Sequence, residues 1–318
     1  MVSSPGATIS STALQLLQLH SHCSPLLPNI VLLDWTSDEA NLLPFITSLF
    51  SSSLTSISIN IPPTADLILS PILGILSTMV PDITSIVVQR LGYVYGPSME
   101  EASSQLLMRC NPCLHTYQVD ATLSASALSH VIQLPLLEQL WLVRPLHFPV
   151  PLPNIVFPSL RTLYVEFNGD LGWLRLLPES SVLSSIYVEC PGPDVGQFME
   201  TFQLTTTGCG MHKRLQKISV QSRDWFKVTP QIIACNLSFT NLTSLRLLSD
   251  CSTTCHTLDV TDEDINLLTN AMPGLICLVI GGKPCTVPSK ITFNSLYTIS
   301  RRCTRLAFLR IHFNPTLS

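Results

Sequence analysis

The chain has 318 residues, of which 46% are hydrophobic and only 12% are charged. Its 17 basic and 21 acidic residues give a net charge of −4, and the sequence contains no run of Lys or Arg. A nucleic acid is therefore excluded as the main partner, because attraction to phosphate needs a clustered basic surface. The composition favours a fold in which apolar side chains pack against neighbours along the whole chain.

The first 29 residues are expected to form an N-terminal tail with one short capping helix over Thr12–Leu19. This start carries no basic segment, and its apolar run is broken by Gln, so it lacks the pattern of a secretory signal. The 11 cysteines are odd in number and scattered along the chain, which indicates reduced thiols. We therefore expect a cytoplasmic or nuclear protein.

From residue 30 onward a short template recurs, with apolar residues at relative positions 0, +3 and +5. Its central copy is Leu160, Leu163 and Val165, and ten steps between Ile30 and Leu306 give a mean period of about 28 residues. The eleven copies begin at Ile30, Leu54, Ile83, Leu114, Leu137, Leu160, Leu183, Leu215, Leu242, Leu275 and Leu306. No single copy could bury its apolar side alone, so the spacing predicts one elongated solenoid over residues 30–318.

The segments between these copies predict helices. Helices are expected over Asn41–Phe50, Leu67–Val80, Ser98–Met108, Asp194–Phe202 and Asp262–Ala271. Ser98 followed by Glu101, and Thr261 followed by acidic residues, are typical helix starts. Three repeats of 23 residues leave little room for a helix, and the proline-rich segment 144–157 is expected to be extended.

The most membrane-like stretch is Leu67–Val80. It is too short to span a bilayer, and Pro71 interrupts it. A buried repeat helix is the simpler interpretation, so no membrane partner is expected.

The spacing L-x-x-L-x-L resembles the core of the leucine-rich repeat, and the resemblance covers Ile30 to Phe313. The phrases LLPNIVLLDW, SLTSISI and VTDEDINLLTNAMPGLICLVIGGKPC are similar to the repeat region of fungal, basidiomycete-type F-box proteins. The resemblance implies an α/β horseshoe with a parallel β-sheet on the concave side and helices or extended segments on the convex side. Only Asn168 and Asn314 match the family's asparagine or cysteine at position +8, so a continuous asparagine ladder is not expected.

The same resemblance implies a function. An F-box-type substrate receptor would bind a protein on its concave face and present it to a cullin-RING ubiquitin ligase. No F-box is visible before Ile30, so binding to a Skp-type adaptor is expected only if an F-box lies upstream. A second hypothesis is a leucine-rich-repeat regulator or inhibitor of an enzyme without ligase coupling, and an enzyme is the third.

Side-chain chemistry gives few candidates for catalysis or metal binding. The segments Cys110–His115 and Cys251–His256 each contain two cysteines and a histidine that could begin a zinc site. Neither is followed by a second ligand pair at zinc-finger spacing, so core and loop thiols are the simpler interpretation. The turn Gly281–Lys283 lacks the surrounding phosphate-binding pattern. The sequence therefore predicts no catalytic residue, no metal and no cofactor.

Position +4 of each repeat lies between the apolar positions, so its side chain should point to the opposite, concave face of the sheet. Aromatic residues occupy this position on three adjacent strands, and two carboxylates follow at position +6. The candidate partner-binding residues are Trp141, Tyr164, Tyr187, Glu166, Glu189, Gln118 and Arg246. Aromatic residues in such a cluster are typical of protein-binding surfaces, although solvent-facing strand positions also favour Tyr and Trp for their β-propensity.

Parallel pairing in register would bring Trp141, Tyr164 and Tyr187 together as one solvent-facing ridge, and the neighbouring carboxylates would favour a partner that carries Lys or Arg. At the other end of the array, the eleventh strand is expected to be an uncovered sheet edge. Leu306 and Leu309 should be poorly shielded there and prone to association.

Overall fold

A computed structural model of the chain describes residues 31–36, 46–61, 66–80, 82–90, 97–110, 112–143, 157–166, 182–222, 226–249, 258–281 and 289–314. The chain divides into two compact units, Met1–Val131 and Ile132–Ser318. Both units are α/β structures with parallel strands. The tail and helix expected over residues 1–29 lie outside the described residues, and a single solenoid over residues 30–318 stays a prediction.

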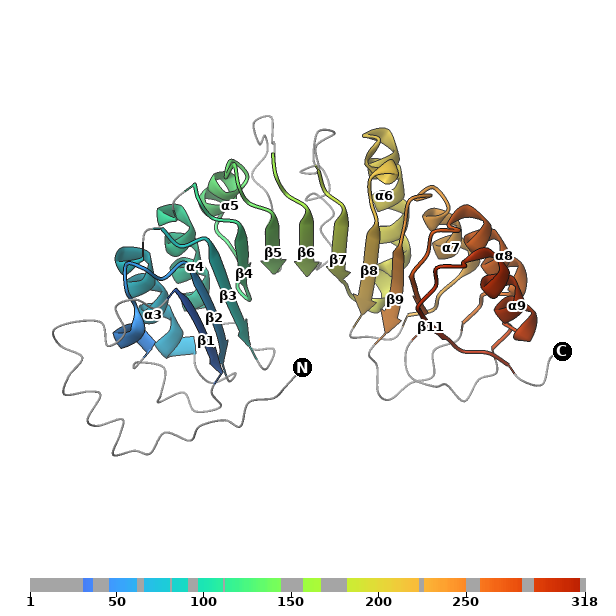
Figure 1. Cartoon of the computed structure of the whole chain (residues 1–318), viewed down its shortest axis with the longest axis horizontal. Coiled ribbons are helices and arrows are strands. Elements are labelled where there is room, and N and C mark those ends of the chain that lie inside the picture. The colour runs from blue at the N-terminus through green and yellow to red at the C-terminus, as the bar shows by residue number, and fades with distance from the viewer. Residues whose placement is uncertain are drawn as a thin grey trace. The chain divides into compact units, whose positions relative to one another are not determined.

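The first unit contains parallel strands that pair in sequence order. These strands are β1 (Leu32–Thr36), β2 (Ser56–Ile61), β3 (Ser85–Arg90) and β4 (Thr116–Val119). The helices that the structure describes here are the 3-10 helix η2 (Thr47–Leu49), α3 (Asp66–Met79), α4 (Pro97–Arg109) and α5 (Ala125–Val131). The α-helices pack against one another in sequence order and lie on one side of the strands (Figure 1).

The second unit repeats this arrangement with more strands. Its strands are β5 (Gln139–Val143), β6 (Thr162–Glu166), β7 (Ser185–Glu189), β8 (Lys217–Ser222), β9 (Ser244–Ser249), β10 (Cys277–Ile280) and β11 (Phe308–Ile311). Its described helices are η5 (Gly192–Asp194), α6 (Val195–Gly208), η6 (Met211–Lys213), α7 (Pro230–Asn236), α8 (Asp262–Ala271) and α9 (Phe293–Arg302). Among the helices in the described ranges, none has the length and apolar character needed to cross a membrane.

The apolar template is confirmed as the buried face of the strands. In repeats two to ten, every residue at positions 0, +3 and +5 is at most 3% exposed. Cross-strand partners share the same position, so that Leu163 lies between Leu140 and Ile186. Side chains alternate along a strand, which turns position +4 to the other face. The predicted register and parallel pairing are therefore confirmed within each unit.

A series of backbone hydrogen bonds at position +1 joins the repeats within each unit. The carbonyl oxygen at this position accepts from two successive N–H groups of the next repeat, with N to O distances between 2.7 and 3.1 Å. The accepting residues are Val31, Thr55 and Thr84 in the first unit, and Glu138, Arg161, Ser184, Gln216, Thr243 and Ile276 in the second. We call this series the carbonyl ladder. It fixes the residue at which each strand begins.

Four of the predicted helices are confirmed as α3, α4, α6 and α8, and α8 has the predicted bounds. Thr261 is the N-cap of α8, where its hydroxyl accepts from the N–H of Asp264 and the Asp264 carboxylate accepts from the N–H of Thr261. This reciprocal pair satisfies donors that a helix start otherwise leaves open. Within the helix expected over Asn41–Phe50, the described part contains the short turn η2.

Three short helices, α5, α7 and α9, are additional to the prediction. α5 lies in a 23-residue repeat, so the expectation that such repeats lack a helix is wrong in this case. Seven residues suffice there, because the hydroxyl of Ser124 accepts from the N–H of Ala127 and caps the first turn. α7 and α9 begin after Thr229 and Thr292, whose hydroxyls accept from backbone N–H groups of the first turn.

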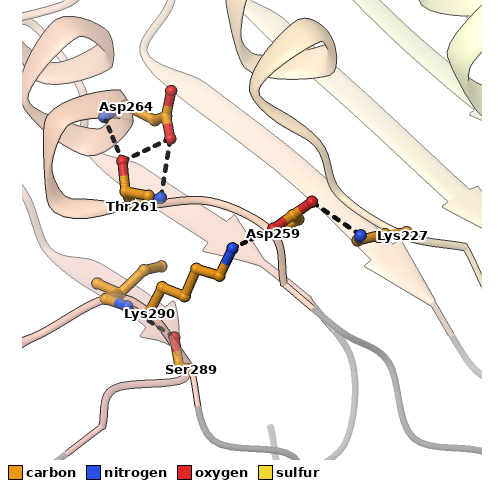
Figure 2. Close-up of polar contacts among 7 residues, drawn as sticks. Lys227, Asp259, Thr261, Asp264, Ser289 and Lys290 are labelled. Atoms are coloured by element: carbon orange, nitrogen blue, oxygen red, sulfur yellow. Dashed lines mark hydrogen bonds and ion pairs between the residues drawn. The ribbon is translucent and has the colours of Figure 1, made fainter.

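A second set of contacts between repeats precedes α7, α8 and α9. Three similar segments provide it: Lys227–Thr229, Asp259–Thr261 and Lys290–Thr292. The carboxylate of Asp259 lies 2.8 Å from the Nζ of Lys227 and 2.7 Å from the Nζ of Lys290 (Figure 2). Hydrogen bonds from these two lysines lower the pKa of Asp259 to about 2. One carboxylate thus connects three successive repeats.

The central core should be sensitive to truncation of Leu163. This side chain is 2% exposed between two equally buried neighbours, so Leu163→Ala is expected to lower the free energy of unfolding by about 2–5 kcal/mol. Leu204 is a matched control in the same unit because it is 73% exposed, and Leu204→Ala should change the free energy by less than about 0.5 kcal/mol. Denaturant titration measures both. Equal effects of the two substitutions would contradict the assigned core.

The pairing of Asp259 should be visible in its titration. Its pKa of about 2 lies below the ordinary value of 3.8, so its ion pairs stabilise the fold above the unfolded-state pKa, and this contribution disappears as the pH falls toward about 2. Replacing Lys227 and Lys290 together by Met should raise the midpoint toward 3.8, as followed by the NMR shift of the carboxyl carbon. Lys213→Met, at an exposed lysine of the same unit, should leave the midpoint unchanged. An unshifted midpoint in the double variant would show that the lysines do not set it.

Candidate functional site

The strands β5, β6 and β7 carry the three aromatic residues in one row. Trp141 pairs with Tyr164, and Tyr164 pairs with Tyr187, as the repeat register predicts. On each strand the neighbouring positions +3 and +5 are buried, whereas all three aromatic residues are half-buried. The row therefore lies on the face of the sheet opposite the apolar core.

Two of the three rings contact each other. The ring centroids of Trp141 and Tyr164 are 3.8 Å apart, and the ring planes are tilted by 38°. The ring of Tyr187 makes no aromatic contact with the residues that the structure describes. The three residues therefore form a row in the predicted register, and within it Trp141 and Tyr164 form an aromatic pair, with the Tyr187 ring on the next strand.

The hydroxyl of Tyr164 explains part of this difference. It donates a hydrogen bond to Oε2 of Glu189 at 2.6 Å. The acceptor lies at position +6 of β7, so this bond directs the Tyr164 side chain toward the carboxyl end of the neighbouring strand. A bond to a carboxylate is stronger than one between neutral groups and fixes the orientation of the ring.

The two carboxylates differ in their environment. Glu189 is only 9% exposed and is engaged by Tyr164, which corrects the expectation that it flanks the aromatic residues as an open acidic group. Glu166 pairs with it across β6 and β7 and is half-buried. Glu166 is therefore the more exposed of the two carboxylates.

Trp141 contributes its ring rather than its indole N–H. Its Nε1 is covered from solvent and has no hydrogen-bond acceptor within the described ranges. The side chains of the pair lie on the face opposite the core, where they are half-buried and contact each other. Such rings stabilise the sheet and can still offer contact area to a partner.

The remaining predicted residues lie in different places. Gln118 lies on β4 of the first unit and is half-buried. Arg246 lies on β9 of the second unit and is exposed, and its register partner Ser219 pairs in turn with Tyr187. Arg246 thus belongs to the same row as the aromatic residues, two strands beyond the last of them.

One further residue on this face was missed by the sequence reasoning. Lys217 is the first residue of β8, at position +2, and it is exposed. Because side chains alternate along a strand, positions +2 and +4 lie on the same face. A comparison of position +2 across the repeats would have found it. With Arg246 it gives β8 and β9 two exposed cations, whereas β6 and β7 carry the carboxylates.

Two of the described thiols, Cys110 and Cys190, are buried, whereas Cys113 is exposed. Burial raises the pKa of Cys110 to about 12, and burial together with the charges of Asp194 and Glu189 raises the pKa of Cys190 to about 12. Such thiols are poor nucleophiles at neutral pH, because the thiolate is the reactive form. Among the described residues no three metal-ligating side chains converge. The segment Cys251–His256 lies outside them.

Comparison with protein-family models gives no match for this chain, and comparison with curated proteins gives none either. The resemblance to leucine-rich-repeat and F-box proteins therefore stays a prediction.

Removing the Tyr164 hydroxyl should destabilise the second unit. Tyr164→Phe keeps the ring but takes a donor from a nearly buried carboxylate, so the free energy of unfolding should fall by about 1–3 kcal/mol. Tyr187→Phe is the matched control, because the Tyr187 hydroxyl has no hydrogen-bond partner in the described part of the chain. Thermal or denaturant unfolding compares the two variants. If both behave alike, the bond to Glu189 does not stabilise the fold.

Proposed function

We propose that this chain is a non-enzymatic protein-recognition module, built as a leucine-rich-repeat solenoid of the horseshoe type whose concave sheet face binds a protein partner. The observation that carries the proposal is the contact pair of Trp141 and Tyr164 on the sheet face opposite the core. Half-buried aromatic rings lose little conformational freedom when a partner covers them, and Trp and Tyr are the residues that most often dominate such interfaces.

The charges around the pair support a partner of mixed charge. The half-buried carboxylate of Glu166 lies on the strand of Tyr164, and Lys217 and Arg246 lie on β8 and β9 of the same sheet. Neighbouring strands are about 4.8 Å apart, so roughly 14 Å separates the strand of Tyr164 from that of Arg246. A partner segment with an apolar or aromatic anchor, a basic group toward Glu166 and an acidic group toward Arg246 would complement this face.

The resemblance to F-box repeat regions supports a more specific role. In that role the chain is the substrate-binding part of a ubiquitin ligase receptor in the cytoplasm or nucleus, and a Skp-type adaptor binds only where an F-box accompanies the repeats. Affinity capture with the full chain, followed by mass spectrometry, tests it. Recovery of a Skp-type adaptor and a cullin together with other proteins supports the receptor role. Recovery of a GTPase or a nuclease without them supports a regulator or inhibitor instead.

The aromatic pair should contribute strongly to binding of the captured protein. Trp141→Ala is expected to weaken binding by about 1–4 kcal/mol, because truncation removes the larger ring of the pair. The purified partner is titrated into each variant by calorimetry, and circular dichroism checks that the variant is folded. Leu204→Ala, at an exposed leucine of α6, is the matched control and should bind as the parent does. Unchanged affinity of folded Trp141→Ala would place the binding site elsewhere.

A further inference from the structure

The helix contact between the last two described repeats shows which positions a neighbouring helix occupies. Asp262 of α8 accepts hydrogen bonds from Thr292 and Ser295 at the start of α9. One turn further along, the carbonyl of Asn266 accepts from Arg302 of α9 at 2.8 Å. The first and fifth residues of α8 therefore face the next helix.

In α9 the same two positions are occupied by large aromatic residues. Counted from the threonine N-caps of both helices, Asp262 corresponds to Phe293 and Asn266 corresponds to Tyr297. Phe293 is 52% exposed and Tyr297 is 64% exposed, and Leu296 beside them is 38% exposed. The face through which α8 binds its neighbour is thus apolar and largely exposed in α9, although the Phe293 ring stacks on Phe313 with centroids 6.3 Å apart.

Strand β11 is open on the same side. Leu309 and Ile311 are half-buried, whereas the residues at the same positions of β10, Leu278 and Ile280, are fully buried. The expectation that Leu306 and Leu309 are poorly shielded is confirmed, because both are half-buried. β11 pairs with β10 and with no further strand in the described part of the chain. We call Phe293, Leu296, Tyr297, Leu309 and Ile311 the end face.

The charge around the end face is one-sided. Residues 289–314 contain five basic residues and no acidic one, in a chain whose net charge is −4. Lys290 is paired with Asp259, and Arg302 bonds to α8. Arg301, Arg305 and Arg310 are exposed; Arg301 donates a hydrogen bond to the Tyr297 hydroxyl, and Arg310 also has an interaction partner. The Arg301 guanidinium lies 5.5 Å from the centre of the Tyr297 ring, so the two side chains form a cation–π contact at the end face.

These features select one occupant. A second copy of the chain would bring two sets of arginines together, which like-charge repulsion disfavours. A lipid or nucleic-acid surface would match the charge but would supply no backbone groups to the open edge of β11. A peptide strand supplies both, because an edge strand accepts a further strand through its main chain while side chains give specificity.

We infer that the end face is a second docking site, which binds an acidic protein segment with interspersed apolar residues as an additional strand beside β11. The segment's apolar residues cover Leu309, Ile311 and the exposed face of α9. Its carboxylates lie near the exposed guanidinium groups of Arg301 and Arg305. This site uses β11 and α9, so it is separate from the aromatic pair on β5 and β6 and does not depend on the function proposed for that pair.

A random-peptide phage library, selected against the full chain, provides the probe. We expect enriched peptides to alternate Asp or Glu with aliphatic or aromatic residues, and the most enriched synthetic peptide to slow hydrogen exchange in β11. Arg305→Glu should weaken its binding at least about tenfold in fluorescence anisotropy. Lys213→Glu makes the same charge change at an exposed site of the same unit and should leave binding unchanged. Tyr297→Ser should also weaken binding, which tests the apolar part of the site.

Several outcomes would overturn the inference. These are a selection that enriches no acidic peptide, binding that Arg305→Glu leaves intact, and exchange protection that appears on β5–β7 instead of β11. Light scattering examines the second copy as an alternative occupant: a dimer of the parent that Tyr297→Ser abolishes would assign the end face to self-association. Arginine-dependent binding to phosphatidylserine vesicles, without any peptide binding, would assign it to a membrane surface.

Discussion

The carbonyl ladder is the constraint on which the rest of each unit depends. One carbonyl oxygen at position +1 holds two N–H groups of the next repeat, so the first residue of the next strand has a fixed place. A slip of one residue would turn every side chain of a strand to the opposite face. The ladder therefore prevents the apolar residues at positions +3 and +5 from changing places with the residues between them. Burial of those apolar side chains then supplies the free energy that keeps the strands paired.

The candidate site shows how the register brings side chains of neighbouring strands into contact. The row of Trp141, Tyr164 and Tyr187 exists because three strands start in step. Two members of the row use that closeness to contact each other, and Tyr164 also bonds to Glu189. A substitution in the pair therefore changes the sheet as well as any interface, and binding measurements have to be read beside measurements of folding.

Backbone features followed from the sequence more directly than side-chain contacts did. The positions of Leu140, Leu163 and Ile186 predicted the register, because the period of a strand is two and the repeats are in phase. The start of α8 was predictable because Thr261 and Asp264 satisfy each other locally. The helices α7 and α9 were missed although Thr229 and Thr292 cap them, because a single threonine is common in loops. The repeated segments around Lys227, Asp259 and Lys290 become recognisable only when they lie side by side.

The environment of Glu189 could not be predicted in the same way. Its position on β7 followed from the register, but its burial depends on how the Tyr164 side chain is turned and on what packs around it. The same holds for Tyr187, which shares the row but not the ring contact. The spacing of the sequence determines the strand position of a residue. The orientation and burial of its side chain depend on the packing around it.

The carbonyl ladder also makes the spacing of the strands independent of the number of residues in each repeat. Its acceptor is an atom that every residue carries, and Glu138, Arg161, Ser184 and Ile276 all serve equally. Consecutive template copies are 23 residues apart in some repeats and 33 in others, as between Leu160 and Leu183 and between Leu242 and Leu275, yet each step of the ladder is the same. Extra residues must therefore be accommodated away from the strands. Within each unit, insertions between strands can therefore lengthen a repeat without changing the pairing or the spacing of the strands.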